Sequence, residues 1–368
     1  MIVGVPKEVK THEYRVGLVP SAVTTLVNHG HRVLVERGAG LGSGTSDEEY
    51  VEQGAEILPD ATSVYGAAEM IVKVKEPQPQ EIELLQRGQI LFTYLHLAPA
   101  PELTQGLLDS GVIGIAYETI QSPDGQLPCL QPMSEVAGRM SIQAGAHCLE
   151  KESGGRGVLL GGVPGVEPGT VVILGGGSVG TNAAQMAVGL GADVMIMDID
   201  LQRLRYLDDI FGGRIRTQFS NPLTIAKMLE RADLVIGAVL VTGARAPRLI
   251  TEDMVRGMKE GAVIVDVAVD QGGIAETTHA TTHDKPTFVR HGVVHYCVAN
   301  MPGAVARTST FALNNATFPY AIAIADKGWK QAVREDHSLF YGVNVVDGDC
   351  VYEPIARDLD LPYVALNL

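Results

Sequence analysis

Short apolar runs rich in β-branched residues alternate with longer amphipathic stretches over the first 130 residues of the chain. Between these runs the apolar positions follow helical spacing, for example at residues 21–28 and 101–109. The runs predict strands at residues 2–5, 32–35, 70–74, 90–94 and 112–116. Such alternation is typical of an α/β fold in which helices cover both faces of a parallel sheet.

The alternation resumes after a turn-like SPDG sequence at residues 122–125. Ser134 can cap a helix that runs to about residue 152, where the glycine pair at 154–155 ends it. Further strands are predicted at residues 171–174, 194–198, 215–219, 234–236, 263–266 and 293–298. An alanine-rich helix follows at about 304–325, and Pro319 should kink it or bound it. We therefore expect two doubly wound α/β domains, the first built from both ends of the chain.

The clearest local signal is a glycine-rich turn directly after the strand at 171–174. Its sequence, GGGSVG at residues 175–180, fits the G-x-G-x-x-G pattern of a dinucleotide-binding fold. Gly175 permits a tight turn, Gly177 lets the backbone approach a pyrophosphate, and Gly180 lets the helix pack on the strand. The unpaired amides and the dipole at the helix start favour the same anion.

Asp198 ends the next strand, 18 residues after Gly180. A dinucleotide fold places an acidic side chain there to bind the adenosine ribose, and its charge repels a 2′-phosphate. This favours NAD over NADP, although Arg203 and Arg205 lie close enough in sequence to keep NADP open. The structural alternative is a glycine turn in an unrelated α/β protein, with Asp198 capping the following helix.

Segments that follow later strands should line the nicotinamide half of the site, because ligands bind at the carboxyl ends of parallel strands. Among them, Asp270 lies beside Gln271-Gly272-Gly273 and puts a carboxylate on a flexible turn, whereas Asp266 lies within its strand and is interpreted as structural. The residues concerned are Val239, Leu240, Val267, Ala268, Val269, Asp270, Val298, Ala299, Asn300 and Met301.

Three polar residues of the first half follow predicted strands. Arg15 can grip a carboxylate with two bonds, Lys75 can add a point charge, and His96 can exchange a proton near neutral pH. Taken singly, each has an ordinary structural explanation as a solvated side chain or a satisfied core histidine. Together they supply the substrate anchor and proton-transfer group that a nicotinamide enzyme needs.

Composition narrows the classes of function. A chain of 368 residues suits two domains, and a net charge of −15 argues against nucleic-acid binding, which needs clustered Lys and Arg. The uncharged stretch at 168–192 is too rich in glycine for a membrane span, and no secretory signal is recognised, so a cytoplasmic protein is expected. The four cysteines lie far apart, which favours free thiols and gives no support for a metal site.

Several sequence blocks resemble alanine dehydrogenases, of the alanine dehydrogenase/pyridine nucleotide transhydrogenase family. Together they cover the chain from residue 1 to about 330, and the last 35 or so residues are idiosyncratic. The blocks are GVPKE at 4–8 with Arg15-Val16, KVKEP at 73–77, FTYLHL at 92–97, MSEVAGR at 133–139, GGVPGV at 161–166, DVAVDQGG at 266–273 and VANMP at 298–302.

The resemblance implies reversible NAD-dependent oxidative deamination of L-alanine to pyruvate and ammonia by a homo-oligomer, commonly a hexamer. It implies that Arg15 and Lys75 bind the substrate and that His96 and Asp270 are the acid/base pair, with their division of proton transfers left open. Arg203 and His279 match variable positions of the family. The further residues implied to contact NAD are Ser134, Ser178, Val179, Asp198, Arg203, Ser220, Val239, Leu240, His279, and Val298 to Met301.

The expected organisation is a substrate domain formed by residues 1–130 and 305–368, with a Rossmann NAD-binding domain inserted at 131–304. One alternative is the soluble NAD-binding component of a proton-translocating transhydrogenase, whose domains resemble those of alanine dehydrogenase. The intact set of Arg15, Lys75 and His96 favours a substrate enzyme. A non-catalytic NAD sensor that kept the fold is a second alternative.

Overall fold

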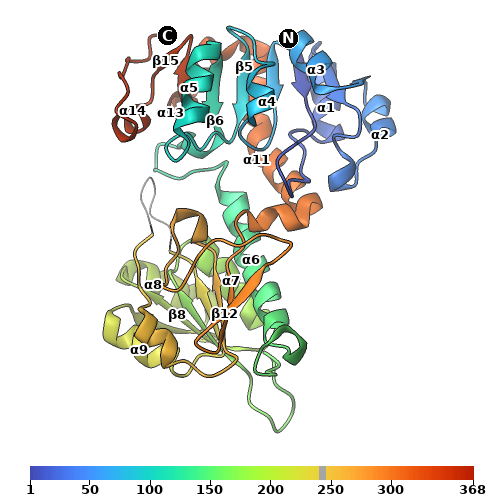
Figure 1. Ribbon diagram of the computed structural model, residues 1–368. Coiled ribbons are helices and arrows are strands. Elements are labelled where there is room, and N and C mark those ends of the chain that lie inside the picture. Colours follow the sequence, from blue (N-terminus) through green and yellow to red (C-terminus); the bar gives the residue numbers. More distant parts are fainter. Residues whose placement is uncertain (240–245) are drawn as a thin grey trace. The chain divides into compact units, whose positions relative to one another are not determined.

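The structure is a computed structural model that describes residues 1–239 and 246–368. The chain divides into two compact units, one formed by residues 1–133 and 303–368 and the other by residues 134–302. Both ends of the chain, blue and red in Figure 1, belong to the first unit. These division points lie within three residues of the expected domain limits at 130 and 305.

The first unit contains an eight-stranded sheet in the order β15-β14-β6-β5-β4-β1-β2-β3. The six strands from β6 to β3 are parallel, and β14 and β15 join antiparallel at the β6 edge. The strands are β1 (Ile2–Val5), β2 (Arg32–Glu36), β3 (Glu56–Leu58), β4 (Met70–Val72), β5 (Ile90–Thr93), β6 (Ile113–Ala116), β14 (Val343–Val346) and β15 (Asp349–Cys350).

The second unit contains a seven-stranded sheet in the order β12-β13-β11-β10-β7-β8-β9. All neighbours are parallel except β12 and β13, and the order from β9 to β13 is that of a dinucleotide-binding fold. The strands are β7 (Thr170–Leu174), β8 (Asp193–Asp198), β9 (Arg216–Phe219), β10 (Leu234–Gly237), β11 (Val263–Asp266), β12 (Thr287–Arg290) and β13 (Val293–Tyr296).

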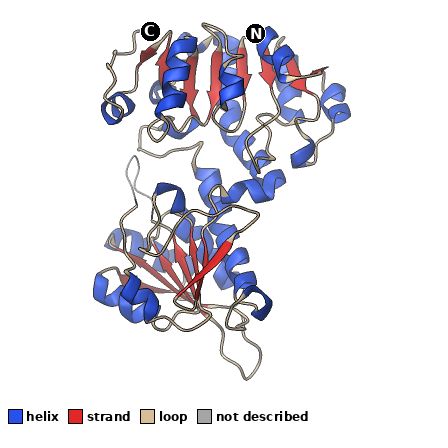
Figure 2. Ribbon diagram, in the orientation of Figure 1, coloured by secondary structure: helices blue, strands red, loops and turns tan. Residues whose placement is uncertain are grey.

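Helices cover both faces of the sheets, as the colouring of Figure 2 shows. In β7 the side chains of Val171 and Ile173 join one buried cluster, whereas those of Val172 and Leu174 join the cluster on the opposite face. This two-sided burial explains the continuous apolar runs of the sequence. The helices are α1 (Pro20–Asn28), α2 (Asp47–Glu52), α3 (Ala61–Ala67), α4 (Pro79–Ile82), α5 (Pro101–Ser110), α6 (Gln131–Cys148), α7 (Ser178–Gly189), α8 (Leu201–Phe211), α9 (Pro222–Leu229), α10 (Glu252–Arg256), α11 (Ala306–Lys327), α12 (Trp329–Glu335), α13 (His337–Gly342) and α14 (Glu353–Asp358).

The expected limits of one helix, at about 134–152, were wrong. Ser134 lies inside α6, which begins at Gln131 and ends at Cys148, so neither the serine cap nor the glycine stop at 154–155 is used. Pro132 at the second helical position explains the earlier start, because proline fits the first turn of a helix.

Pro319 lies inside α11 and does not bound it. Proline lacks one backbone donor, but Leu313, Ala321 and Ile324 on either side of it are buried, and this packing stabilises the helix across the missing bond.

The stretch at 168–192 forms strand β7 and helix α7, as its glycines predicted. Within the described residues, no helix is both long enough and apolar enough to cross a membrane. The four cysteines are free and buried.

Candidate functional site

The glycine turn of the second unit lies between β7 and α7. Gly175 adopts a φ of 105°, and a Cβ there would approach the carbonyl oxygen of Ala238 to 2.6 Å. A Cβ on Gly180 would lie only 1.9 Å from the carbonyl oxygen of Gly175, whereas one on Gly177 would meet nothing within 4 Å. Backbone atoms therefore crowd the turn at Gly175 and Gly180, whereas the space beside Gly177, where the backbone leads into the helix, is open. This arrangement fits a pyrophosphate at the helix start.

Asp198 and Arg203 lie beside this turn. The Asp198 carboxylate accepts the amide of Gly176 at 2.6 Å and that of Asp200 at 2.9 Å, which leaves acceptor positions for ribose hydroxyls. Arg203 donates from Nε to the Gly176 carbonyl oxygen and from Nη2 to Thr181 Oγ1 at 2.7 Å. The guanidinium thus holds the turn together, a role that its sequence position did not reveal.

Other candidates of this unit follow the neighbouring strands. Ser220 follows β9, and its amide donates to the Asp198 carbonyl oxygen at 2.9 Å. The Val239 side chain borders Gly175, with its Cγ2 3.0 Å from the position of an added Cβ. Leu240 lies outside the described residues. Ser134 lies one turn before Gly138 in α6, and a Cβ on Gly138 would lie 2.3 Å from the Val179 carbonyl oxygen, so α6 passes close to the start of α7.

The segments 267–270 and 298–301 meet at the ends of β11 and β13. Asp270 lies in a short 3₁₀ turn, and its Oδ2 accepts the amide of Asn300 at 3.4 Å. Asn300 has a φ of 59°, which gives the second segment a sharp local bend. The exposed ring of His279 stacks on Phe288, with 3.9 Å between the ring centroids.

Asp266 holds the turn that carries Asp270. Its fully buried carboxylate accepts the amides of Ala268 at 3.1 Å and Ile274 at 2.8 Å, which lie on either side of Asp270. Burial raises the pKa of Asp266, and these backbone donors offset part of that effect. The structure thus gives Asp266 a structural role at the candidate site.

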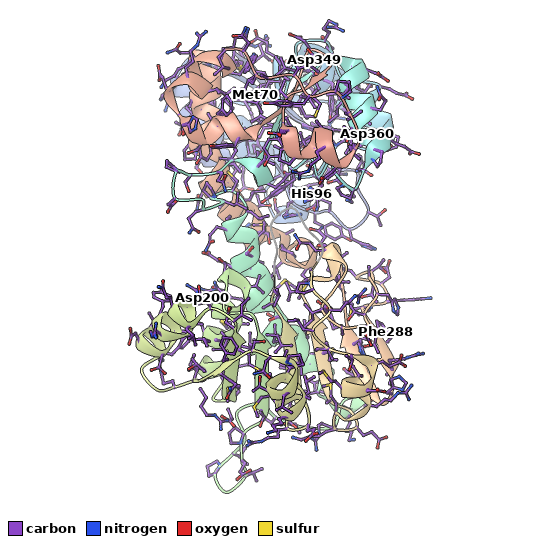
Figure 3. All side chains as sticks on the ribbon, turned by 90° about the vertical axis from the view of Figure 1, so that its left-hand side faces the viewer. Met70, His96, Asp200, Phe288, Asp349 and Asp360 are labelled. Carbon is purple, nitrogen blue, oxygen red and sulfur yellow. The ribbon has the colours of Figure 1, made fainter. Side chains whose placement is uncertain are left out.

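In the first unit, Arg15, Lys75 and His96 follow β1, β4 and β5, which are neighbours in the parallel sheet. Figure 3 shows His96 at the opposite end of this unit from Met70, the first residue of β4. The three side chains therefore belong to the carboxyl edge of the sheet, where α/β folds bind ligands.

Arg15 is buried and paired with Glu13. Its Nε donates to Glu13 Oε1 at 2.6 Å and its Nη2 to Oε2 at 2.5 Å, while Nη1 lies 3.1 Å from Met133 Sδ. Burial alone would lower the pKa of Arg15, but the Glu13 carboxylate outweighs it and the net pKa is raised. Glu13 thus binds the Nε and Nη2 side of the guanidinium, and Nη1 lies on the Met133 sulfur.

Lys75 lies in a turn that buried charges hold in place. Glu8 accepts the amides of Val74 at 2.6 Å and Lys75 at 3.3 Å, and it also pairs with the fully buried Lys73, which binds Glu81 as well. The Lys75 ammonium makes no hydrogen bond to a residue in the described part of the chain. Its pKa is lowered, first by burial and then by nearby cations, which together outweigh Glu76.

His96 lies in a loop that Glu118 anchors. The amide of His96 donates to Glu118 Oε1 at 2.6 Å, and the amide of Leu95 donates to the same carboxylate at 3.2 Å. The backbone of His96 is left-handed, with a φ of 51°, which is uncommon outside glycine. Its ring lies near Tyr94, at 5.5 Å between centroids, and its Nδ1 lies 3.8 Å from Glu76 Oε2.

The supporting carboxylates were missed at the level of sequence. Glu8 and Glu76 stand within the family-like blocks, but they were not assigned a role, and the 22 residues between His96 and Glu118 gave no local signal of contact. Only the neighbouring positions of β5 and β6 in the sheet bring Glu118 to the His96 loop.

Together the two units define the class of the protein: an α/β protein with a dinucleotide-binding fold inserted into a second, discontinuous domain that carries charged residues at its sheet edge. Comparison of the sequence with family models identifies the family. Residues 4–137 match the N-terminal domain of alanine dehydrogenase/PNT, and residues 141–353 match its C-terminal domain. The chain belongs to the alanine dehydrogenase/PNT family, which implies a nicotinamide cofactor.

Individual relatives agree over the full length. Alanine dehydrogenase of Methanococcus maripaludis is 60% identical over 364 residues, which cover 99% of this chain and 98% of the relative. A solved L-alanine dehydrogenase superposes with a TM-score of 0.95 at 54% identity, over 98% of this chain and 99% of the other. A transhydrogenase from Sinorhizobium meliloti superposes with a TM-score of 0.81 at 24% identity, over 96% and 99% of the two chains, and shares the fold.

Proposed function

We propose that this protein is an NAD-dependent L-alanine dehydrogenase that catalyses the reversible oxidative deamination of L-alanine to pyruvate and ammonia. The observation that carries the proposal is 60% identity to an alanine dehydrogenase over 99% of the chain. The arrangement of Arg15, Lys75 and His96 at one sheet edge supports it independently of the relatives.

Arg15 and Lys75 are the proposed binding groups for the substrate carboxylate. A guanidinium can donate to a carboxylate, and Glu13 fixes the plane of the Arg15 guanidinium through Nε and Nη2. The Lys75 ammonium is largely buried without a hydrogen-bond partner in the described residues, so an incoming carboxylate relieves its desolvation. A negative ligand at this position should in turn raise the pKa of Lys75.

Asp198 is the proposed determinant of NAD against NADP. Its carboxylate lies at the glycine turn, where it can accept hydrogen bonds from both ribose hydroxyls and repel a 2′-phosphate. Arg203, which could otherwise favour the phosphate, donates to Gly176 and Thr181 instead. The contacts of both residues therefore support NAD.

His96 and Asp270 are the proposed acid/base groups. When bound, the nicotinamide supplies the hydride acceptor, and the chain provides the proton transfers. The water that adds to the imine carbon must lose a proton, and the departing nitrogen must gain one. The side chain of His96 is 43% exposed, so it can also exchange protons with solvent between turnovers.

A homo-oligomer, commonly a hexamer in similar proteins, and a cytoplasmic location are further parts of the proposal. The turn after α6 exposes three apolar side chains, Leu159, Val163 and Val166, which favours burial against another copy. Sedimentation velocity on the purified chain should show one species several times heavier than 39.1 kDa.

The decisive experiment measures NADH absorbance with purified protein, NAD and L-alanine at alkaline pH. D-Alanine, L-serine, L-lysine and NADP serve as parallel controls. We expect rapid NADH formation with L-alanine and NAD and little with NADP. A folded protein that binds NAD but forms no NADH would refute the proposal and favour the transhydrogenase component or a sensor, which the same preparation would distinguish by adding a second nucleotide.

A further inference from the structure

The carboxylate of Glu76 lies between the Lys10 ammonium and the imidazole of His96, the candidate acid/base residue. Its Oε1 pairs with the Lys10 ammonium, whereas its Oε2 is buried and makes no hydrogen bond in the described part of the structure. The imidazole Nδ1 of His96 lies 3.8 Å from this Oε2. A buried carboxylate oxygen without a donor is uncommon and costly, so this oxygen indicates an acceptor that another state of the protein uses.

The backbone on both sides of this gap is fixed. Glu118 holds the amides of Leu95 and His96, and Glu8 holds the amide of Lys75 directly before Glu76. Closing 3.8 Å to the 2.7–3.2 Å of an N–H···O bond therefore needs only a rotation of the His96 side chain that moves Nδ1 by about 0.6–1.1 Å. Hydrogen bonds between catalytic groups are often long before substrate binds.

We propose that Glu76 is a positioning residue for His96: its Oε2 accepts the Nδ1–H of the imidazole and leaves Nε2 as the atom that exchanges a proton with the substrate. A proton taken up at Nε2 makes His96 a cation, which the adjacent carboxylate stabilises. The inference rests on the proposed function, because it assigns Glu76 a role in that reaction.

The charges around the pair support an ionised Glu76. Burial raises the pKa of Glu76, but Lys75, Lys10 and His96 outweigh it, so the net pKa is lowered. The Tyr94 ring lies 5.5 Å from the imidazole between centroids, and the Glu118 carboxylate accepts the backbone amide of His96.

The test is the pH dependence of kcat/KM for L-alanine, measured at saturating NAD for the wild type and for Glu76→Gln. The low-pH side of this profile, its acid limb, reports protonation of the base, here His96, which must be neutral in the deamination direction. Removing the negative charge makes the imidazolium less stable, so the acid limb should move to lower pH by about one unit. The loss of orientation should lower kcat by about 10- to 100-fold.

Lys10→Met is the matched control because it breaks the same ion pair from the other side. It removes a positive charge and frees Glu76 Oε1 from its ion pair, so the acid limb should move to higher pH. A merely structural ion pair predicts that both substitutions act in the same direction. Opposite shifts support the inference, and parallel shifts overturn it.

A third comparison uses the His96→Ala background. If Glu76 acts through His96, Glu76→Gln should lower kcat there by less than about twofold, and an undiminished loss overturns the inference.

If Glu76→Gln does not fold, Glu76→Asp and Lys10→Met carry the test. Glu76→Asp should lower kcat and keep the wild-type acid limb. A limb shifted to lower pH overturns the inference. A wild type that forms no NADH refutes the proposed function, whereas an active wild type whose pH profile coincides with that of Glu76→Gln refutes only this inference.

Discussion

Replacing Gly180 by alanine should disrupt the glycine turn, while the same replacement at Gly189 of the same helix should not. A Cβ on Gly180 would lie 1.9 Å from the Gly175 carbonyl oxygen, about 1.5 Å closer than ordinary contact allows. A Cβ on Gly189 would meet nothing within 4 Å. Because the obstructing atom at Gly180 is backbone, either α7 or the turn must shift.

Overpacking of this kind costs about 1–3 kcal/mol, and in a unit of this size each kcal/mol lowers Tm by about 2–4 °C. Gly180→Ala should therefore lower the Tm of the second unit by roughly 2–12 °C. Gly189→Ala should keep or slightly raise it, since alanine favours helix by up to about 1 kcal/mol.

The assay is thermal unfolding of both variants with and without NAD, together with the KM for NAD at saturating L-alanine. A displaced turn should raise this KM by about 10- to 100-fold for Gly180→Ala and leave it unchanged for Gly189→Ala. The reasoning fails if Gly180→Ala retains both the Tm and the NAD affinity of the wild type, or if the two variants are equally impaired.

Three further substitutions test other parts of the structure. Asp198→Ala should raise the KM for NAD and reduce the preference for NAD over NADP, and an unchanged KM in steady-state kinetics would remove its ribose role. Glu118→Gln should lower kcat by about 10- to 100-fold with little change in KM, because the His96 loop loses its anchor, whereas Glu69→Gln, which removes a carboxylate bonded to a backbone amide elsewhere in the unit, should keep kcat. Lys73→Met should lower the free energy of unfolding in urea by about 3–5 kcal/mol, because it leaves two buried carboxylates without their cation, and a smaller loss would mean that they become protonated.

The central strands of both sheets could be predicted because their burial on two faces gives continuous apolar runs. The prediction failed at the edges. β3 (Glu56–Leu58) and β12 (Thr287–Arg290) are short and partly exposed, so they lack such a run. In β14 (Val343–Val346) the apolar pattern is broken by Asn344, which is nevertheless fully buried because its amide nitrogen donates to Thr119 Oγ1 at 2.9 Å.

The principal candidate residues of the site could be found because parallel strands place the residues that follow them at one edge. Arg15, Lys75 and His96 all follow this rule. Their carboxylate partners also follow parallel strands, but which of them meet depends on the order of the strands in the sheet. Glu118 follows β6 and reaches the loop after β5 only because these strands are neighbours, and the sequence alone did not establish that order.

The charges at the carboxyl edge of the sheet in the first unit explain why the Lys75 ammonium is available to the ligand. Glu13 occupies one side of the Arg15 guanidinium, Glu118 is committed to backbone amides, and Glu76 is shared by Lys10 and His96. Lys75 is thus a largely buried ammonium, and the nearby carboxylates Glu76 and Glu13 are engaged with Lys10 and Arg15. An amino acid brings the missing carboxylate together with its own ammonium, so it can pair with Lys75 and Arg15 without adding net charge to the edge. A neutral amine without a carboxylate would leave the Lys75 charge uncompensated, and this physical difference favours α-amino acids over simple amines as substrates.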